Sequence, residues 1–118
     1  QGLSQLSVMA IYQDELGTMW FGTREGVNRY NGNTMEVFRP VPNDNNSLNG
    51  SLVKNICGGK NGFVYIHSQN GINEYCMKTG EMKMVQRDRA DAIGYGIRNL
   101  WITEDNCLYA YNEGVKTL

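Results

Sequence analysis

The polar residues best placed to bind a ligand lie in short turns between pairs of expected strands. They are Arg24 and Glu25 in one turn, Gln69 and Asn70 in the equivalent turn 45 residues later, and Glu113 in a third turn. An arginine guanidinium can donate two parallel hydrogen bonds to a carboxylate or to neighbouring hydroxyl groups. We take these five residues as candidate ligand-binding positions, with ordinary solvated hairpin residues as the alternative.

No group of residues has the composition or spacing of a catalytic or metal site. Asp14 has no second carboxylate that recurs with it, so we expect it to cap a turn. His67 has no serine or cysteine nucleophile fixed beside it and is expected to be packed or hydrogen-bonded. Cys57, Cys76 and Cys107 make an odd number without a Cys-x-x-Cys pair, which favours free thiols over a disulfide or a zinc site. We therefore predict no catalytic residue, no metal and no cofactor.

These residues sit within a sequence that repeats itself. Residues 3–30 align with residues 48–75 at a constant spacing of 45, and residues 97–100 begin a third copy at a spacing of 44. A β-type repeat of this length is typical of propeller blades. The identical pairs are Leu3/Leu48, Val8/Val53, Ile11/Ile56, Gly17/Gly62, Gly26/Gly71, Asn28/Asn73 and Tyr30/Tyr75.

Each repeat reads as short strands separated by turns, and helical spacing is almost absent. The expected strands are 8–13, 19–23, 27–30 and 34–38; 52–57, 63–68, 72–75 and 81–86; and 96–103, 107–111 and 115–118. Trp20 lies in an apolar strand that would be covered on both faces, so we expect it in the core rather than stacked on a sugar ring. Gly22 and Gly26 are assigned to close packing and to a positive-φ turn.

The expected fold is all-β: four-stranded antiparallel blades in an incomplete propeller of about two and a half to three blades. The divisions are residues 1–47, 48–95 and 96–118. Closed propellers generally have about four to eight blades. We therefore expect further blades as partners, and self-association of the isolated chain through its uncovered faces, most simply as a symmetric dimer.

Composition excludes several classes of protein. The chain is 41% hydrophobic and 19% charged, with a formal net charge of −1. This balance is that of a soluble globular segment. It lacks the basic face that a nucleic-acid-binding protein needs, so nucleic acid is not an expected partner. No apolar run reaches the length of a transmembrane helix.

The first repeat also resembles a known family. The residues Gln13-Asp14, Gly17, Trp20-Phe21-Gly22-Thr23 and Gly26-Val27-Asn28-Arg29-Tyr30-Asn31-Gly32 are similar to the two-component regulator propeller repeat. The second and third repeats depart from its Trp-x-Gly-Thr strand, with Tyr65-Ile66-His67-Ser68 and Tyr109-Ala110-Tyr111-Asn112. The resemblance points to the N-terminal sensor part of a Bacteroides-type hybrid two-component histidine kinase and response regulator.

The resemblance implies a function that the residues alone do not. The chain would be a periplasmic part of an inner-membrane protein and would respond to oligosaccharide breakdown products by signalling to a cytoplasmic kinase. It would not itself be an enzyme. One alternative is a protein-interaction propeller that binds no small ligand. The other is part of a propeller polysaccharide lyase or glycosidase, whose paired carboxylates or Tyr/His base would lie in other blades.

Overall fold

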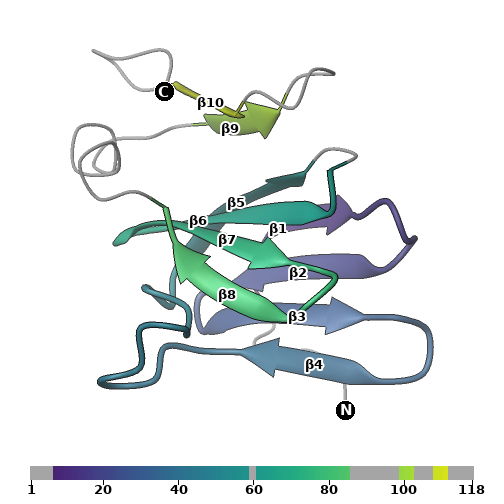
Figure 1. Ribbon diagram of the computed structural model, residues 1–118, viewed down its shortest axis with the longest axis horizontal. Coiled ribbons are helices and arrows are strands. Elements are labelled where there is room, and N and C mark those ends of the chain that lie inside the picture. Colours follow the sequence, from purple (N-terminus) through teal and green to yellow (C-terminus); the bar gives the residue numbers. More distant parts are fainter. Residues whose placement is uncertain (1–6, 59–60, 86–98, 103–107, 112–118) are drawn as a thin grey trace.

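Ten strands form three antiparallel sheets in residues 7–58, 61–85, 99–102 and 108–111, the parts that the computed structural model describes (Figure 1). The first sheet contains β1 (Val8–Gln13), β2 (Met19–Thr23), β3 (Gly26–Tyr30) and β4 (Met35–Phe38) in chain order. The second contains β5 (Val53–Gly58), β6 (Phe63–Ser68), β7 (Gly71–Cys76) and β8 (Glu81–Met84). The third pairs β9 (Asn99–Ile102) with β10 (Leu108–Tyr111).

This architecture confirms the predicted all-β class with two successive four-stranded blades. Strands β1, β2 and β6 have the predicted bounds. Strands β3 and β7 begin one residue earlier than predicted, because Gly26 and Gly71 already pair with Thr23 and Ser68 across their hairpins. The predicted strand 115–118 lies outside the described residues. So does the boundary between the second and third blades, and the division into blades stays a prediction.

Asp14 organises the turn between β1 and β2. One carboxylate oxygen accepts hydrogen bonds from the backbone N–H groups of Leu16 and Thr18, both at 3.0 Å. The other accepts from Trp20 Nε1 at 2.8 Å and from the Thr18 hydroxyl, and it lies 3.3 Å from Arg29 Nη2. Asp14 is therefore the predicted turn cap, and it also ties the turn to the indole and guanidinium groups beside it.

The Asp14 carboxylate should make the fold sensitive to acid. Burial alone would raise its pKa, but hydrogen bonds from Thr18 and Trp20, with the charge of Arg29, bring the pKa below its ordinary value. Such a group stabilises the fold above its unfolded-state pKa, and this contribution is lost as the pH falls through the folded-state pKa. We expect the free energy of unfolding to fall below about pH 4, and to fall less steeply in Asp14→Asn. Urea titrations across the acid range would measure both slopes, and equal slopes would exclude this carboxyl as the source.

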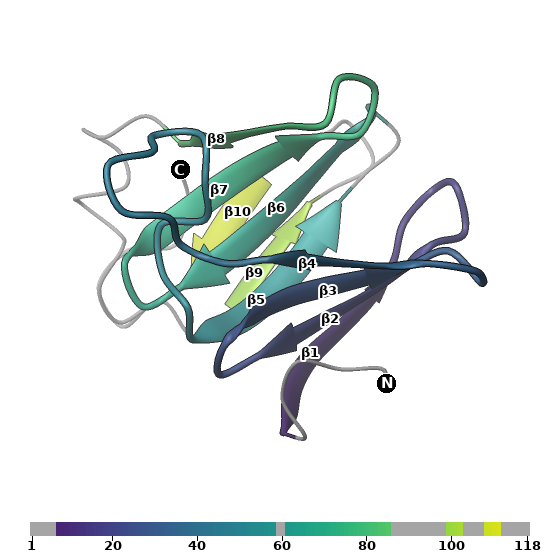
Figure 2. The same ribbon diagram turned by 90° about the horizontal axis from the view of Figure 1, so that it is seen from below.

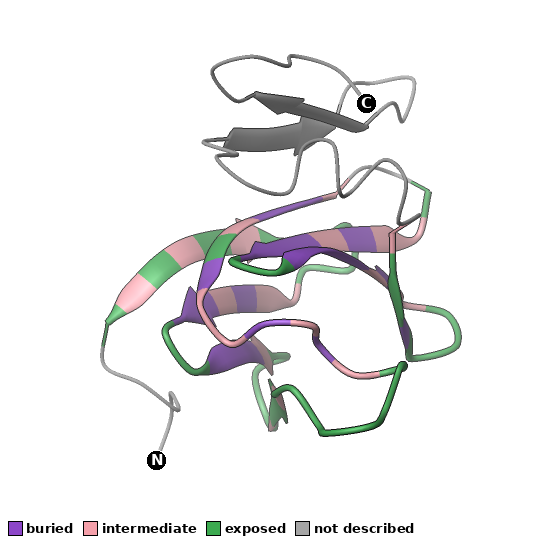
Figure 3. Cartoon of the chain, turned by 90° about the vertical axis from the view of Figure 1, so that its left-hand side faces the viewer, coloured by how far each residue is buried: buried purple, intermediate pink, exposed green. Residues whose placement is uncertain are grey.

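The two four-stranded sheets pack face to face. The first contributes Trp20, Val27 and Phe38, and the second contributes Val53, Ile56, Val64, Ile66, Tyr75 and Met82. Trp20 is 0% exposed, and its ring centroid lies 5.2 Å from that of Tyr75 in an edge-to-face arrangement. A Cβ added at Gly22 would lie only 2.6 Å from Cγ1 of Val53. Trp20 is therefore core, and Gly22 lets the second sheet approach, as predicted. The buried positions lie mainly in the strands of the two sheets, and the exposed ones mainly in the loops (Figure 3).

Polar contacts also join the two sheets. Arg29 lies over the rings of Trp20 and Tyr75, at 5.2 and 5.7 Å from their centroids, and its Nη1 donates to the Tyr75 hydroxyl at 3.5 Å. At the turns on the same side, the backbone N–H of Gly62 donates to Oε1 of Glu15 at 3.0 Å. Stacked guanidinium and aromatic groups of this kind fix the relative position of two packed elements as well as adding attraction.

The histidine and the two described cysteines are buried or half-buried within the second sheet. His67 is 1% exposed, and its Nδ1 lies 3.1 Å from Nδ2 of Asn55. Cys57 is a buried free thiol whose pKa is raised to about 12 by burial, and Cys76 is a half-buried free thiol. Cys107 lies outside the described residues. Within the described residues no cluster of metal-binding side chains is found, and no helix has the length and apolarity needed to span a bilayer.

Candidate binding rim

Four of the five predicted ligand-binding residues lie along one side of the molecule. The β2–β3 turn carries Arg24 and Glu25, the β6–β7 turn carries Gln69 and Asn70, and all four are exposed. Both turns lie on the left-hand side of Figure 1, as does the crossover, residues 39–52, that joins β4 to β5. We call these three segments the binding rim. Glu113 lies outside the described residues.

The first half of the crossover is folded into two consecutive turns. The N–H of Asp44 donates to the carbonyl of Val41 at 3.1 Å, and the N–H of Ser47 donates to the carbonyl of Asp44 at 3.3 Å. The Ser47 hydroxyl closes the loop by accepting from the N–H of Val41 at 3.0 Å. Asn43 has a positive φ of 65°, a conformation that asparagine tolerates better than most residues. Residues 40–47 therefore form neither a helix nor a strand, but their turns give them a compact structure.

The second half of the crossover is held by a buried asparagine of β7. Oδ1 of Asn73 accepts from the N–H of Asn49 at 2.9 Å, and its Nδ2 donates to the carbonyl of Lys83 at 3.2 Å. Asn73 is 0% exposed. Sequence reasoning did not assign it a role, although the identity of Asn28 and Asn73 across the repeats was the signal that could have found it.

The candidate residues Gln69 and Asn70 also hold the crossover. Oε1 of Gln69 accepts from the N–H of Leu52 at 2.9 Å, and Nδ2 of Asn70 donates to the carbonyl of Asn49 at 2.8 Å. The other turn is joined to the same stretch, because the N–H of Gly26 donates to the carbonyl of Ser51 at 2.7 Å. Both hairpin turns therefore position residues 49–52, and the ligand-binding role of the candidates stays a prediction.

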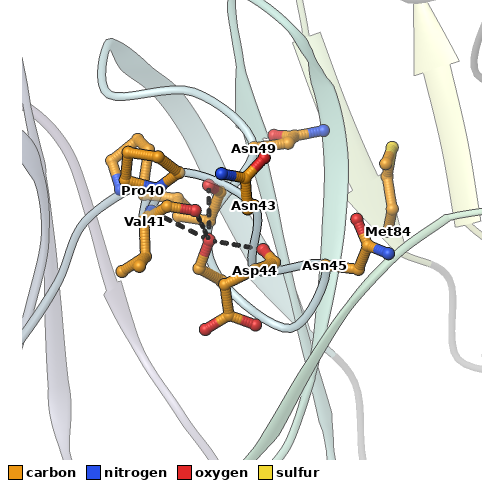
Figure 4. Close-up of a pocket in the computed structure, with 10 residues that line it drawn as sticks. Pro40, Val41, Asn43, Asp44, Asn45, Asn49 and Met84 are labelled. Atoms are coloured by element: carbon orange, nitrogen blue, oxygen red, sulfur yellow. Dashed lines mark hydrogen bonds between the residues drawn. The ribbon is translucent and has the colours of Figure 1, made fainter.

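A cleft of about 470 Å³ opens between the crossover and β8 (Figure 4). Its volume falls within the usual range of small-molecule sites. Its wall combines the side chains of Asn43, Asn45 and Asn49 with apolar surface and one carboxylate. The remaining lining residues are Pro40, Val41, Pro42, Asp44, Ser47, Leu48 and Met84. Amide groups next to apolar surface can bind a neutral polyhydroxylated molecule. The sequence indicated only a linker here, because the cleft depends on the path of residues 40–49 and on their approach to Met84 of β8.

The comparison with known protein families concerns the N-terminal repeat. Residues 2–25 match the family described as two-component regulator propeller. This segment is similar to the two-component regulator propeller repeat. It contains the Asp14 turn and the Trp20 strand, whose side chains join the first sheet to the second. The resemblance predicted from those residues is confirmed.

Relatives of the regulator propeller repeat include signalling proteins. The chain is 47% identical over 47 residues to histidine kinase P4 of Formosa agariphila, a match that covers 40% of this chain and 3% of that protein. The extracellular domain of the hybrid two-component system BT3049 from B. thetaiotaomicron has a similar structure, with a TM-score of 0.76 and 20% identity. The extracellular domain of the one-component system BT4673 from the same organism is also similar, with a TM-score of 0.70 and 16% identity.

This chain aligns with only a small share of each solved structure. All of this chain aligns with 19% of the first structure, and 94% of it aligns with 16% of the second. At these identities the structures show that the fold is that of propeller extracellular domains. The chain therefore corresponds to a small part of much longer proteins.

Proposed function

We propose that this chain is part of the extracytoplasmic sensor propeller of a membrane-anchored hybrid two-component receptor. The regulator propeller repeat at residues 2–25, in a chain whose fold resembles extracellular domains of such systems, is the observation that carries the proposal. The relationship to a histidine kinase supports a signalling role. Phosphotransfer would belong to other parts of the receptor, and this chain would contribute blade surface and one edge of a ligand site.

The ligand we propose is an oligosaccharide that binds along the binding rim. The cleft beside the crossover supports this, since the amide side chains of Asn43 and Asn45 line it together with the exposed apolar side chains of Val41 and Met84. Arg24 and Glu25 could extend the site along the rim by hydrogen bonding to hydroxyl groups. A ligand there would signal only through different affinities for two arrangements of the receptor.

A binding role fits the surroundings of Asp14 better than a hydrolytic role. A glycosidase needs one carboxyl that can donate a proton to substrate and a second nearby. Asp14 is 4% exposed, its pKa is lowered despite its burial, and its oxygens accept hydrogen bonds from Thr18 and Trp20. It is therefore unsuited to act as an acid on a bound sugar.

Backbone amide NMR during titration with a panel of neutral and acidic oligosaccharides would test the proposal. We expect shifts concentrated in residues 40–52 and 69–70. Removing the cleft amide in Asn45→Ala should weaken binding about 5–30-fold, the effect of losing one or two hydrogen bonds. The matched control is Asn33→Ala, an exposed asparagine in the β3–β4 turn on the opposite side, which should leave the affinity unchanged.

Three outcomes would contradict the proposed ligand. Saccharide binding that Asn45→Ala does not affect would place the site elsewhere. Capture of a protein at the rim, with no saccharide bound, would favour an interaction propeller. Cleavage of an added polysaccharide would favour a lyase or glycosidase.

A further inference from the structure

The wall of the cleft beside the crossover carries a single charge, and that charge is negative. Of the ten described residues that line the cleft, Asp44 alone is charged; the others are apolar residues, asparagines and a serine (Figure 4). No lysine, arginine or histidine is among these ten. An anionic ligand in the cleft would therefore meet a negative charge and no positive one.

Lys83 of β8 is next to the cleft in sequence but does not line it. It precedes Met84, which lines the cleft, and the side chains of consecutive strand residues point to opposite faces. Nζ of Lys83 lies 3.7 Å from Oε1 of Glu81. The ammonium group is therefore paired with a carboxylate of its own strand, away from the cleft.

Arg39 and Arg24 lie at the β2–β3 turn rather than at the cleft. Cγ of Arg39 would lie 3.3 Å from a Cβ added at Gly26. Arg24 belongs to the same turn, which meets the crossover at Ser51 through the N–H of Gly26. Proteins generally bind carboxylate and sulfate groups with arginine or lysine, and the cleft wall offers neither.

The carboxylate of Asp44 has one oxygen left for a ligand. Its Oδ1 accepts a hydrogen bond from the N–H of Asn46 at 2.9 Å, which stabilises the turn. Within the described part of the chain, Oδ2 accepts no hydrogen bond and no cation is paired with the carboxylate. Such an oxygen accepts a hydrogen bond from a sugar hydroxyl but repels a second anionic group.

We propose that the cleft selects uncharged oligosaccharides and rejects those bearing carboxylate or sulfate groups, with Asp44 as the residue that sets this selectivity. The inference rests on the proposed saccharide-binding function and adds the class of saccharide. Hydroxyl groups of a neutral sugar donate to Asp44 and exchange hydrogen bonds with Asn43 and Asn45. A uronate or sulfated sugar instead presents negative charge to the same carboxylate, and no guanidinium or ammonium group of the wall compensates for it.

Paired oligosaccharides that differ only in charge test the proposal. The probes are tetrasaccharides of glucose, mannose or galactose, and the same tetrasaccharides with each C6 alcohol oxidised to a carboxylate. In amide NMR titrations, the neutral forms should bind about 5-fold or more tightly than the uronate forms in low salt, the effect expected for two like charges about 4 Å apart in water. The difference should shrink in about 0.5 M sodium chloride, because salt screens exposed charges.

Asp44→Asn isolates the charge from the turn. Asparagine keeps an oxygen that accepts from the N–H of Asn46, but it carries no charge. The variant should bring the affinities for neutral and uronate forms to within about 2-fold of each other, chiefly by tightening uronate binding. The matched control is Glu36→Gln, which makes the same change in net charge at an exposed carboxylate of β4 and should leave the discrimination unchanged. A purely structural role of Asp44 would instead weaken both forms equally.

The possible failures of this inference and of the proposed function are distinguishable. Equal affinities for the two forms, tighter binding of the uronate forms, or a preference that Asp44→Asn leaves unchanged would overturn the selectivity alone, because saccharide binding itself would stand. Binding of neither form would overturn the proposed saccharide function and the selectivity with it.

Discussion

Replacing Trp20 with alanine is expected to lower the free energy of unfolding by about 3–5 kcal/mol, the range for removing a fully buried tryptophan. Trp20 is 0% exposed and packs on both Phe38 and Tyr75, so the substitution leaves a cavity between the two sheets. It also removes a donor from the buried carboxylate of Asp14. Urea denaturation followed by circular dichroism would measure the loss.

Trp20→Phe separates the two contributions. Phenylalanine keeps an aromatic ring against Tyr75 but cannot donate a hydrogen bond to Asp14. We therefore expect Trp20→Phe to have a free energy of unfolding between those of the wild type and Trp20→Ala. A Trp20→Ala protein as stable as the wild type would show that the two sheets are not held together by this ring. It would also contradict the assignment of Trp20 to the core.

Gly26→Ala should lower the free energy of unfolding by about 3 kcal/mol or more. The substitution combines backbone strain at a positive φ with a steric clash of the added Cβ. Gly26 has a φ of +117°, where a side chain is strained, and an added Cβ would lie 2.3 Å from the carbonyl oxygen of Phe38. The clash is with backbone, so no side-chain rotation relieves it. The substitution would also displace the N–H that donates to Ser51 of the crossover.

Gly32→Ala is the matched control, measured by the same denaturation experiment. Gly32 also has a positive φ, of +102°, but no atom lies within 4 Å of an added Cβ. Its cost should be the backbone strain alone, about 1–2 kcal/mol. Equal losses at the two positions would show that the contact between Gly26 and Phe38 contributes nothing, and that conformational strain accounts for both effects.

Much of the fold follows from local sequence signals. The turn at Asp14 and Gly17 could be predicted because a short carboxylate and a residue free to adopt positive φ satisfy that turn by themselves. The apolar strand around Trp20 predicted an element covered on both faces; Trp20 is buried against the second sheet, whereas Met19 and Phe21 on the other face are only half-buried. The 45-residue repeat then transferred these assignments to the second sheet, where β6 was predicted with its observed bounds. The turn and strand signals act within a few residues, and the repeat carries them from the first sheet to the second.

The binding rim was predictable only in part, because its structure depends on contacts between distant residues. The sequence placed Gln69 and Asn70 in an exposed turn, but not their hydrogen bonds to Leu52 and Asn49. Nor could the sequence show that Asn73 would accept a hydrogen bond from Asn49 of the crossover, since its side-chain amide could equally have bonded to another residue. The cleft beside β8 arises from the path of the crossover, which the sequence left open.

The attachment of the crossover has a consequence for insertions and deletions. Residues 49–52 bond to both hairpin turns, through Gly26 on one side and Gln69 on the other. A change of length there would displace both turns at once. Residues 40–46 bond chiefly among themselves, so natural variants should gain or lose residues in that stretch, altering the wall of the cleft while the spacing of the blades stays constant.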